Sequence, residues 1–428
     1  MLTFYRSPKL ELLANELVKV YSEKPLADPL EEEIVIVQNH GMAQWLSKWM
    51  ARTMGISGNV KFPFPAEKIW DFYRTMDETI PKDLPSDREP MTWAVYSLLQ
   101  NISDQSPYKS VWYYTRGENG KLNSLKTWKL AVRIGDLFDQ YLIYRPTMIL
   151  NWEDDKYKAS GAQEAWQADL WNRLQSRWQK NYPDLRWMHR AAIHRDFMQA
   201  LRKGDIDKEK MPERLTFFGL SGMPPTSIDA FVHLSRQVDI HWFWMDPAAG
   251  SSLGSLEESW GGEGQEFLSL FSKAIEKSSV NVEEVHLAGE ETEKGTRPPQ
   301  RAESQTLDLF TPTPGLHRTS LPNLQIHSCH SEQREMEVLH DNILELFNSN
   351  PDLEPDDILI LAPDIQRYAP FIKGVFGTTE EGQPAIPFTL LMMSAVHRKR
   401  CLTFFPSFST CWRAVLKFRK SLIFYLVA

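Results

Sequence analysis

The segment that follows the apolar run Ile34–Val37 is where nucleotide chemistry would be expected. In a nucleotide-binding α/β domain, a phosphate binds at the N-terminus of the helix after a buried strand. A phosphate-binding loop needs glycines for close backbone approach, a lysine for the β- and γ-phosphates, and a serine or threonine for Mg²⁺. Gln38–Trp45 contains only Gly41 and no lysine, serine or threonine, and no G-x-x-x-x-G-K-[ST] motif occurs elsewhere. The sequence therefore predicts that this chain does not hydrolyse ATP unaided.

An acidic residue, Asp246, follows the apolar segment Val238–Trp244. Asp246 could contact a metal-bound nucleotide, but Pro247 stands where a second acid would polarise the attacking water. An apolar strand followed by a proline is typical of a simple strand and turn. We interpret this segment as structural, and we assign no catalytic residue to the chain.

Four potential zinc ligands lie close together in the sequence. A zinc site needs four ligands that converge in tetrahedral geometry, and it usually shows C-x-x-C or H-x-x-x-H spacing. Neither spacing is present here, so we predict no metal site and expect roles in the core or in capping instead. The residues are His327, Cys329, His330 and His340.

Two sets of side chains have the chemistry to contact nucleic acid. Phe64 and Trp70 could stack on unpaired bases, and such stacking contributes roughly 1–3 kcal/mol per base. Asp136, Asp139 and Arg145 could contact base edges, because carboxylates accept from amino groups and arginine donates to guanine. Each set also has a structural interpretation, as core aromatics or as a solvated stripe with an internal ion pair. Spacing alone favours the structural interpretation for both.

The first 60 residues show the opening of an α/β domain. Leu2–Tyr5 is typical of a short strand, and Ser7 and Pro8 are predicted to provide a helix cap and a first-turn proline. Apolar residues then recur at helical spacing, and Ile34–Val37 is typical of a buried parallel strand. A helix is predicted to follow, with Gly55 as its C-terminal residue.

A large helical segment is predicted in the middle of the chain. The two prolines within Phe62–Pro65 exclude a helix interior and predict a rigid extended segment. A helix resumes at Ile69–Met76, and the pattern is mainly helical from Trp93 to Phe197. One long helix is expected over about Leu125–Ile143. We interpret residues 76–209 as a helical insertion.

Strand patterns return after the helical insertion. Leu215–Gly219 and Val238–Trp244 are predicted strands on either side of a helix near Ser227–Ser235. Residues 276–322 are charged and contain proline and threonine, which predicts a linker or mobile insertion. A second α/β unit is then expected, with strands at Leu324–Ser328 and Ile358–Leu361 and a helix at Glu332–Phe347.

Composition excludes several classes of protein. The chain has 428 residues, 42% of them hydrophobic and 12% aromatic, and a formal net charge of −8. Contacts with nucleic acid would therefore use local patches of positive charge, or a positive electrostatic field that partner subunits supply. Three cysteines form no disulfide framework, which predicts a reducing cytoplasm. No secretory signal or membrane-spanning run is recognised.

The last residues differ in composition from the rest. Residues 390–428 contain seven Lys or Arg and no Asp, Glu, Gly or Asn, although the chain has 56 acidic residues in total. One interpretation is a basic amphipathic helix that binds a membrane or a partner. We prefer the interpretation that this tail is non-native, out-of-frame sequence, because Pro, Cys and Phe-Phe breaks spoil the helical period.

Several segments together resemble the gamma subunit of bacterial exodeoxyribonuclease V, the RecC family. They occur in family order up to about residue 389 and cover about the first third of a family member. The family pattern ends where the acidic residues end, which predicts a truncated product. The matching segments are Glu33–Trp45, Phe62–Asp71, Asp136–Pro146, Ala165–Trp171, Phe218–Pro225, His327–Asp341 and Ile372–Phe376.

The resemblance implies a superfamily-1 helicase-like fold, a P-loop-type α/β fold with a degenerate nucleotide site. It implies a non-catalytic subunit that guides DNA strands, recognises the Chi hotspot and assembles with RecB-type beta and RecD-type alpha subunits, which bind ATP and Mg²⁺. His40 and Phe64 replace the usual Thr and Leu, which leaves the exact hotspot open. The DNA-contacting positions that it implies are Gln38, His40, Gln44, Phe64, Trp70, Asp136, Leu137, Asp139, Arg145 and Arg190.

The resemblance also implies a domain order. Residues 1–275 are expected to form a first helicase-like domain, with its α/β core in 1–75 and 210–250. Residues 323–389 are expected to begin a second one. Two other function classes stay open from the residues: an autonomous helicase-type ATPase, and a scaffold protein with no role in nucleic-acid binding.

Overall fold

The computed structural model forms two units, Met1–Glu291 and Thr292–Ala428, each with its own core. Among the helices of the described residues, none is long and apolar enough to cross a membrane. The described residues are 1–105, 107–118, 120–154, 156–207, 210–246, 261–287, 327–362, 364–377, 386–390 and 425–427.

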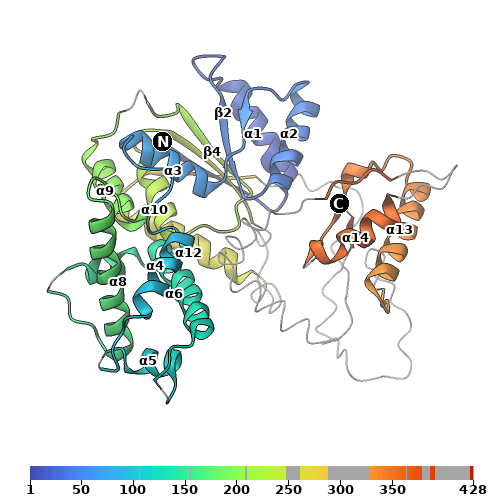
Figure 1. Cartoon of the computed structure of the whole chain (residues 1–428). Helices are drawn as coiled ribbons and strands as arrows, with labels where there is room; N and C mark the ends of the chain where they lie inside the picture. Colours follow the sequence, from blue (N-terminus) through green and yellow to red (C-terminus); the bar gives the residue numbers. More distant parts are fainter. Residues whose placement is uncertain are drawn as a thin grey trace, which may run out of the picture. The chain divides into compact units, whose positions relative to one another are not determined.

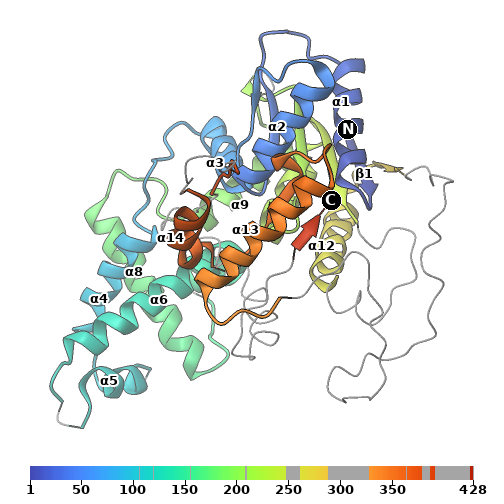
Figure 2. The same ribbon diagram turned by 90° about the vertical axis from the view of Figure 1, so that its right-hand side faces the viewer.

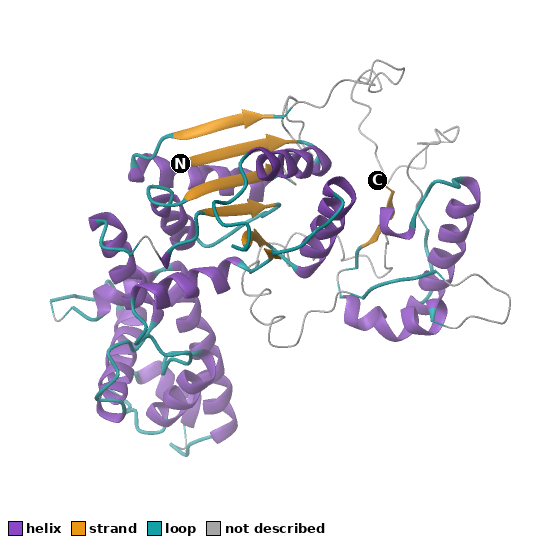
Figure 3. Cartoon of the chain, turned by 90° about the horizontal axis from the view of Figure 1, so that it is seen from above, coloured by secondary structure: helices purple, strands orange, loops and turns teal. Residues whose placement is uncertain are grey.

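The first unit is built on a six-stranded sheet in the order β3-β2-β4-β5-β1-β6, in which every pair is parallel. Figure 3 shows its strands side by side. Parallel strands need crossover helices that cover both faces, which makes such strands apolar on both sides. The strands are β1 Leu2–Ser7, β2 Glu33–Val37, β3 Val60–Lys61, β4 Arg214–Phe218, β5 Asp239–Met245 and β6 Val282–His286.

Alternate strand residues enter two different cores, as the two-residue period of a strand requires. Tyr5, Val37 and Phe243 belong to the core with helices α1 (Leu10–Glu23) and α2 (His40–Met54). Phe4 and Trp242 belong to the core on the other face. The helices of that face are α3 Pro65–Met76, α9 Arg190–Lys203, α10 Pro225–Leu234 and α12 Gly262–Ser278.

The helical insertion has a core of its own, and α5 lies at its end farthest from the sheet (Figures 1 and 2). Helices α4 and α6 pack closely, because a Cβ on Gly135 would lie 2.4 Å from Thr92 Oγ1. The long helix predicted over about Leu125–Ile143 is confirmed as α6. The helices are α4 Arg88–Leu99, α5 Lys109–Arg116, α6 Ser124–Tyr144, α7 Pro146–Trp152 and α8 Ala162–Asn181.

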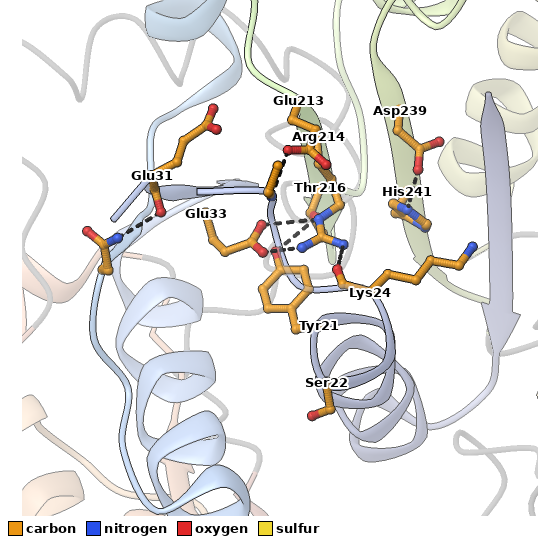
Figure 4. A network of polar contacts seen from close by, with 12 residues as sticks. Tyr21, Ser22, Lys24, Glu31, Glu33, Glu213, Arg214, Thr216, Asp239 and His241 are labelled. Atoms are coloured by element: carbon orange, nitrogen blue, oxygen red, sulfur yellow. Dashed lines mark hydrogen bonds and ion pairs between the residues drawn. The ribbon is translucent and has the colours of Figure 1, made fainter. Parts of the chain in front are cut away.

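The amino edge of the sheet is tied together by a buried polar network (Figure 4). Arg214, 5% exposed, pairs through two nitrogens with the Glu33 carboxylate. It also donates to the Lys24 carbonyl at 2.8 Å, and its guanidinium lies 4.6 Å from the Tyr21 ring centroid. The Tyr21 hydroxyl in turn donates to Thr216 Oγ1 at 2.9 Å. This network joins α1, β2 and β4 through satisfied buried polar groups.

The second unit has a small core between two helices. Met336 and Ile343 of one helix pack with Ile372 and Phe376 of the other. Strand β7 pairs antiparallel with β8. The elements are α13 Glu332–Ser349, the 3₁₀ turn η2 Pro355–Asp357, β7 Ile358–Ile360, α14 Ile365–Phe376 and β8 Tyr425–Val427.

Two local predictions at helix starts need correction. The structure extends β1 to Ser7, so α1 begins at Leu10 with Lys9 as its N-cap residue. Ser7 is therefore not the cap, and its Oγ accepts from the Lys9 N–H at 3.2 Å within the turn. Pro65 is not part of the extended segment but the first residue of α3, where its missing N–H costs nothing.

The linker predicted over residues 276–322 is wrong in its first part. Helix α12 continues to Ser278, and Val282–His286 form β6, which pairs with β1. The α/β core expected in 1–75 and 210–250 therefore includes this later strand. Residues 288–322 lie outside the described residues. So do most of the strand predicted at Leu324–Ser328 and, apart from residues 390 and 425–427, the tail predicted as non-native.

Candidate nucleic-acid interface

Loops that leave the carboxyl ends of the parallel strands meet at one edge of the sheet. In open α/β sheets this edge is where ligands bind, at the point where the strand order reverses. Gln38 follows β2, Gly219 follows β4 and Asp246 follows β5. We call these loops and the helix starts beside them the carboxyl edge.

The order of the strands places the reversal point at β1. Helix α1, which follows β1, covers one face, and α12, which leads from β5 past β1 to β6, covers the other. The loop in which a phosphate would bind is thus the β1–α1 turn. The loop predicted from the sequence follows β2, three positions away from β1 in the sheet, so that prediction of the phosphate position is wrong.

The β1–α1 turn does not fit a nucleoside triphosphate. It holds no glycine, and Ser7 is fully buried with its Oγ engaged by Lys9. Arg6 Nη2 lies 2.5 Å from Asp246 Oδ2, and the Asp246 N–H donates to the Ser7 carbonyl at 2.8 Å. The aspartate that could hold Mg²⁺ is therefore paired with an arginine of this chain.

Gln38 connects two loops of the carboxyl edge. Its Oε1 accepts from the backbone N–H of Ser221 at 3.2 Å and from the Ser221 hydroxyl at 2.8 Å. Asn39 caps α2 by accepting from the Met42 N–H at 2.9 Å. The amide NH₂ of Gln38 is not used in these bonds and remains a donor for a ligand. Ser221 was not singled out in the sequence, because only the fold brings it to Gln38.

His40 and Phe64 lie against each other at the start of α2 and α3. Their ring centroids are 4.8 Å apart, edge to face. The Pro63 carbonyl accepts from the Val37 N–H at 3.2 Å, which holds the extended segment beside β2. His40 is exposed, and so is Gln44, one helical turn further along α2. The structure therefore brings these three predicted residues to one part of the carboxyl edge.

Gly219 allows α2 to approach the loop after β4. Its φ is +61°, a left-handed conformation that favours glycine. A Cβ at this position would lie 2.9 Å from Met42 Cε. Gly219 was not recognised as a site residue from the sequence, although it lies within the segment Phe218–Pro225.

Trp70 is half-buried, so part of its ring belongs to the core and part is open to solvent. One side of its ring packs against the core and edge-on against Tyr73, with centroids 5.5 Å apart. The guanidinium of Arg74 lies 5.5 Å from the ring centroid. The Tyr73 hydroxyl lies 2.9 Å from His194 Nδ1, and burial lowers the pKa of His194 to about 4. This histidine is therefore neutral at pH 7.

The acidic residues of α6 pair with arginines of other helices. Asp136 pairs with Arg88 of α4, and Asp139 Oδ1 accepts from Arg190 Nη2 at 2.7 Å. Both members of the second pair are 20% exposed. Arg88 was missed in the sequence, because nothing local marks an ion pair between residues 48 positions apart.

Arg145 does not form the ion pair expected within its own stripe. It is the C-cap residue of α6, is exposed, and lies over the Tyr141 ring at 5.9 Å. The expected internal pair is therefore wrong, because α6 ends before this residue. Leu137 is half-buried between the two aspartates. Burial, with the Asp139 charge second, raises the pKa of Tyr144 to about 12.

The predicted residues thus form two groups that neighbouring helices connect. Gln38, His40, Gln44 and Phe64 gather at the carboxyl edge. Asp136, Leu137, Asp139 and Arg190 gather where α6 meets α4 and α9. Helix α9 packs against α6 and also against α3, which carries Trp70. Among the described residues, no three or more His, Cys, Asp or Glu side chains are placed to hold a metal ion.

Comparison with known proteins places the chain in a family. The family model for the N-terminal domain of RecC matches residues 2–261. The chain is 29% identical over 447 residues to the RecBCD enzyme subunit RecC of Escherichia coli (strain K12). This match covers 88% of the chain and 38% of that protein. For the same subunit of Haemophilus influenzae, identity is 28% over 462 residues, covering 91% of the chain and 40% of the protein.

A third relative is the RecBCD enzyme subunit RecC of Mycolicibacterium smegmatis, 27% identical over 397 residues, with 88% of the chain and 34% of the protein covered. The chain spans between 34% and 40% of the length of these three relatives. The matched residues 2–261 include β1 to β5 and all of α1 to α10, so both groups of predicted residues lie within them. The chain therefore belongs to the RecC family, and its matched part is the N-terminal domain of that family.

Proposed function

We propose that this chain is a non-catalytic DNA-binding part of a RecBCD-type exodeoxyribonuclease V. In this proposal it guides unwound strands, contacts the Chi hotspot during double-strand break repair, and works in the bacterial cytoplasm. Its partners are a RecB-type and a RecD-type subunit, which carry ATP and Mg²⁺. The relatives are RecBCD enzyme subunits RecC, which supports this assignment.

The fold within this proposal is that of a superfamily-1 helicase-like domain with a degenerate nucleotide site. An all-parallel sheet with a reversal point at β1 supports it. Under this assignment residues 1–275, together with β6, form the first helicase-like domain, and residues 323–389 begin a second one.

The observation that carries the proposal is the chemistry of the carboxyl edge. At a position where a motor protein would bind phosphates, Arg6 and Asp246 pair with each other. Further along the same edge, after β2, Gln38, His40 and Phe64 offer an amide, an imidazole and an aromatic ring. These groups suit contacts with bases, since stacking is sequence-tolerant and the amide NH₂ of Gln38 can donate to an acceptor on a base edge.

The ion pairs of α6 give the second group a defined orientation. The Asp139 carboxylate and the Arg190 guanidinium are held by each other, yet each is partly exposed. A carboxylate retains acceptor capacity after one hydrogen bond, and a guanidinium retains donors. The pair can therefore present an acceptor and a donor to base edges without prior rearrangement.

Substitution of Trp70 tests the proposal. Binding of the full chain to fluorescein-labelled single-stranded DNA would be measured by anisotropy at fixed salt. Trp70→Ala is expected to raise the Kd about 5- to 150-fold, which corresponds to the loss of one stacked base. Trp166→Ala on α8, also half-buried, is the matched control and should leave the Kd within about twofold.

Two outcomes would contradict the proposal. Absence of measurable DNA binding by the wild-type chain would favour a scaffold without a role in nucleic-acid binding. ATP turnover by the purified chain, lost when Asp246 is replaced by Ala, would favour an autonomous ATPase.

A further inference from the structure

The chain concentrates positive charge in one segment of the helical insertion. Residues 109–133 contain six Lys or Arg and one acidic residue, in a chain whose net charge is −8. This segment comprises α5, the turn after it and the first half of α6. The core of the helical insertion is apolar, so its folding does not depend on these surface cations. A local excess of positive charge on an acidic chain therefore needs another explanation.

One side of α6 presents these charges together with apolar groups. Leu125, Trp128 and Lys129 lie on one face at helical spacing, with Lys126 beside them, whereas Thr127 is buried on the opposite side. Leu125 is 63% exposed.

Exposed aromatic rings flank this side of α6. Trp93 of α4 is 55% exposed, and its ring centroid lies 4.4 Å from that of Trp128. Tyr114 of α5 is 49% exposed, and Lys126 Nζ lies 5.9 Å from its ring centroid. We call the set Trp93, Tyr114, Leu125, Lys126, Trp128 and Lys129 the basic aromatic face.

Hydrogen bonds connect the two helices that carry Tyr114 and Lys126. The Asn123 N–H donates to the Thr115 carbonyl at 2.8 Å, and the Asn123 side chain caps α6 by accepting from the Lys126 N–H at 3.0 Å. These bonds join the start of α6 to the end of α5. Side chains on helices that are already joined lose less entropy on binding than side chains on separate segments.

The chemistry of this face favours single-stranded nucleic acid over a protein partner. Protein interfaces are depleted in lysine, whereas single-strand binding surfaces combine cations with rings on which bases stack. The face offers Lys126 and Lys129 for phosphates, and Trp93 and Tyr114 for bases. Its positive charge complements the phosphate backbone.

The face lies on the same helix as part of the proposed site. Asp136 stands ten residues beyond Lys126 on α6, which corresponds to about 15 Å along the helix axis. We propose that the basic aromatic face is a second contact for single-stranded DNA, which extends a bound strand along α6 from the Asp136–Asp139 region toward α5. This inference rests on the proposed function and assigns it an additional surface.

A double charge reversal tests the inference with the full chain. Lys126→Glu with Lys129→Glu is compared with wild type on oligodeoxythymidylates of about 6 and about 20 nucleotides over a range of salt concentrations. Weaker binding of the long strand is expected, at least 10-fold, with a salt slope about 1.4 smaller in magnitude and little change for the short strand. Lys203→Glu with Lys273→Glu, exposed lysines of α9 and α12, is the matched control.

Photocrosslinking of the long strand with iodinated uracils gives a direct readout. Crosslinks at Trp93 or Tyr114 are expected in addition to those near Trp70. If the charge reversal matches the control on the long strand while Trp70→Ala still weakens binding, the inference is wrong and the proposed function stands. If the wild-type chain binds neither strand, both are wrong. Capture of an acidic protein by this face without any effect on DNA would also overturn the inference.

Discussion

Arg214 and Arg190 both pair with a carboxylate, but their surroundings give the two pairs different roles. Arg214 is buried at the amino edge of the sheet, where Glu33, the Lys24 carbonyl and the Tyr21 ring surround it. Arg190 and Asp139 are partly exposed on the helical side. A buried pair whose hydrogen bonds are complete fixes the geometry of elements, whereas a partly exposed pair can still accept a ligand.

Replacement of Arg214 tests the structural role of the buried pair. Arg214→Met leaves the Glu33 carboxylate without its main partner, so the free energy of unfolding is expected to fall by about 3–5 kcal/mol. Urea denaturation followed by circular dichroism measures this change.

Two further variants make the Arg214 result interpretable. Arg173→Met breaks an exposed pair with Asp169 on α8 and should change stability by less than about 1 kcal/mol. Arg214→Met combined with Glu33→Leu should regain part of the loss, because no unpaired charge remains. A loss for Arg214→Met no larger than that for Arg173→Met would contradict the structural role.

Residue types alone predicted some side chains of the candidate site but not their partners. The side chains of Asp136 and Asp139 were recognised from their types and shared helix face. Their arginine partners come from α4 and α9, and only tertiary packing brings these helices to α6. The same limit applied to Ser221, since its bond with Gln38 spans 183 positions in the sequence.

At the scale of elements, the carboxyl edge depends on how closely α2 approaches the loop after β4. Asn39 sets where α2 begins, by capping the Met42 N–H. Gly219 sets how near Met42 can come to the β4 loop. The positions of Gln38 and His40 therefore depend on two small local features, a cap and a left-handed glycine.

Gly219→Ala is expected to disturb this approach. The substitution adds strain at φ +61° and places a Cβ 2.9 Å from Met42 Cε, the end of a flexible side chain that can move aside, so a loss of about 1–2 kcal/mol in the free energy of unfolding is predicted. Weaker single-stranded DNA binding should accompany it, measured by anisotropy.

Gly204→Ala is the matched control for the contact between Met42 and the Cβ that Gly219→Ala adds. Gly204 also has a positive φ, +75°, but no atom lies within 4 Å of its added Cβ. It should lose only the conformational part, about 1 kcal/mol, with unchanged DNA binding. Equal losses for both variants would show that contact with Met42 has no effect.

The sequence predicted most elements, because the helical and strand periods were clear. Strand β6 was missed because Val282 and Val285 are three residues apart and two glutamates separate them, which does not give the alternation of a strand. Its pairing with β1 supplies the hydrogen bonds that local pattern does not reveal. The reversal point at β1 could not be predicted either, because the order of strands in a sheet depends on tertiary pairing and not on local sequence.

At the scale of the whole molecule, the chain divides into units with separate cores. The first unit contains the sheet, its two covering layers and the helical insertion. The second has a smaller core between α13 and α14. Each proposed DNA contact lies entirely in the first unit, so its geometry is defined without reference to the second.

A shortened chain of residues 1–291 is expected to fold on its own. It retains all six strands and the three cores of the first unit. Its circular dichroism should show the helix and strand content of that unit, and thermal unfolding should be cooperative. Single-stranded DNA binding should persist.

A chain ended at residue 210 is the control for this prediction. It lacks β4, β5 and β6, which leaves β1 without either neighbour in the sheet. This shorter chain is expected to be unfolded. Loss of cooperative unfolding in the 1–291 chain would show that the first unit needs the rest of the protein.

Strand β6 has a consequence for the behaviour of the protein in solution. It is an outermost strand of the sheet, and Glu283, Glu284 and His286 are exposed along it. The open hydrogen-bonding side of such a strand can recruit a strand from another molecule, and charged side chains oppose this. We therefore expect Glu283 and Glu284 to oppose association of molecules through this edge strand.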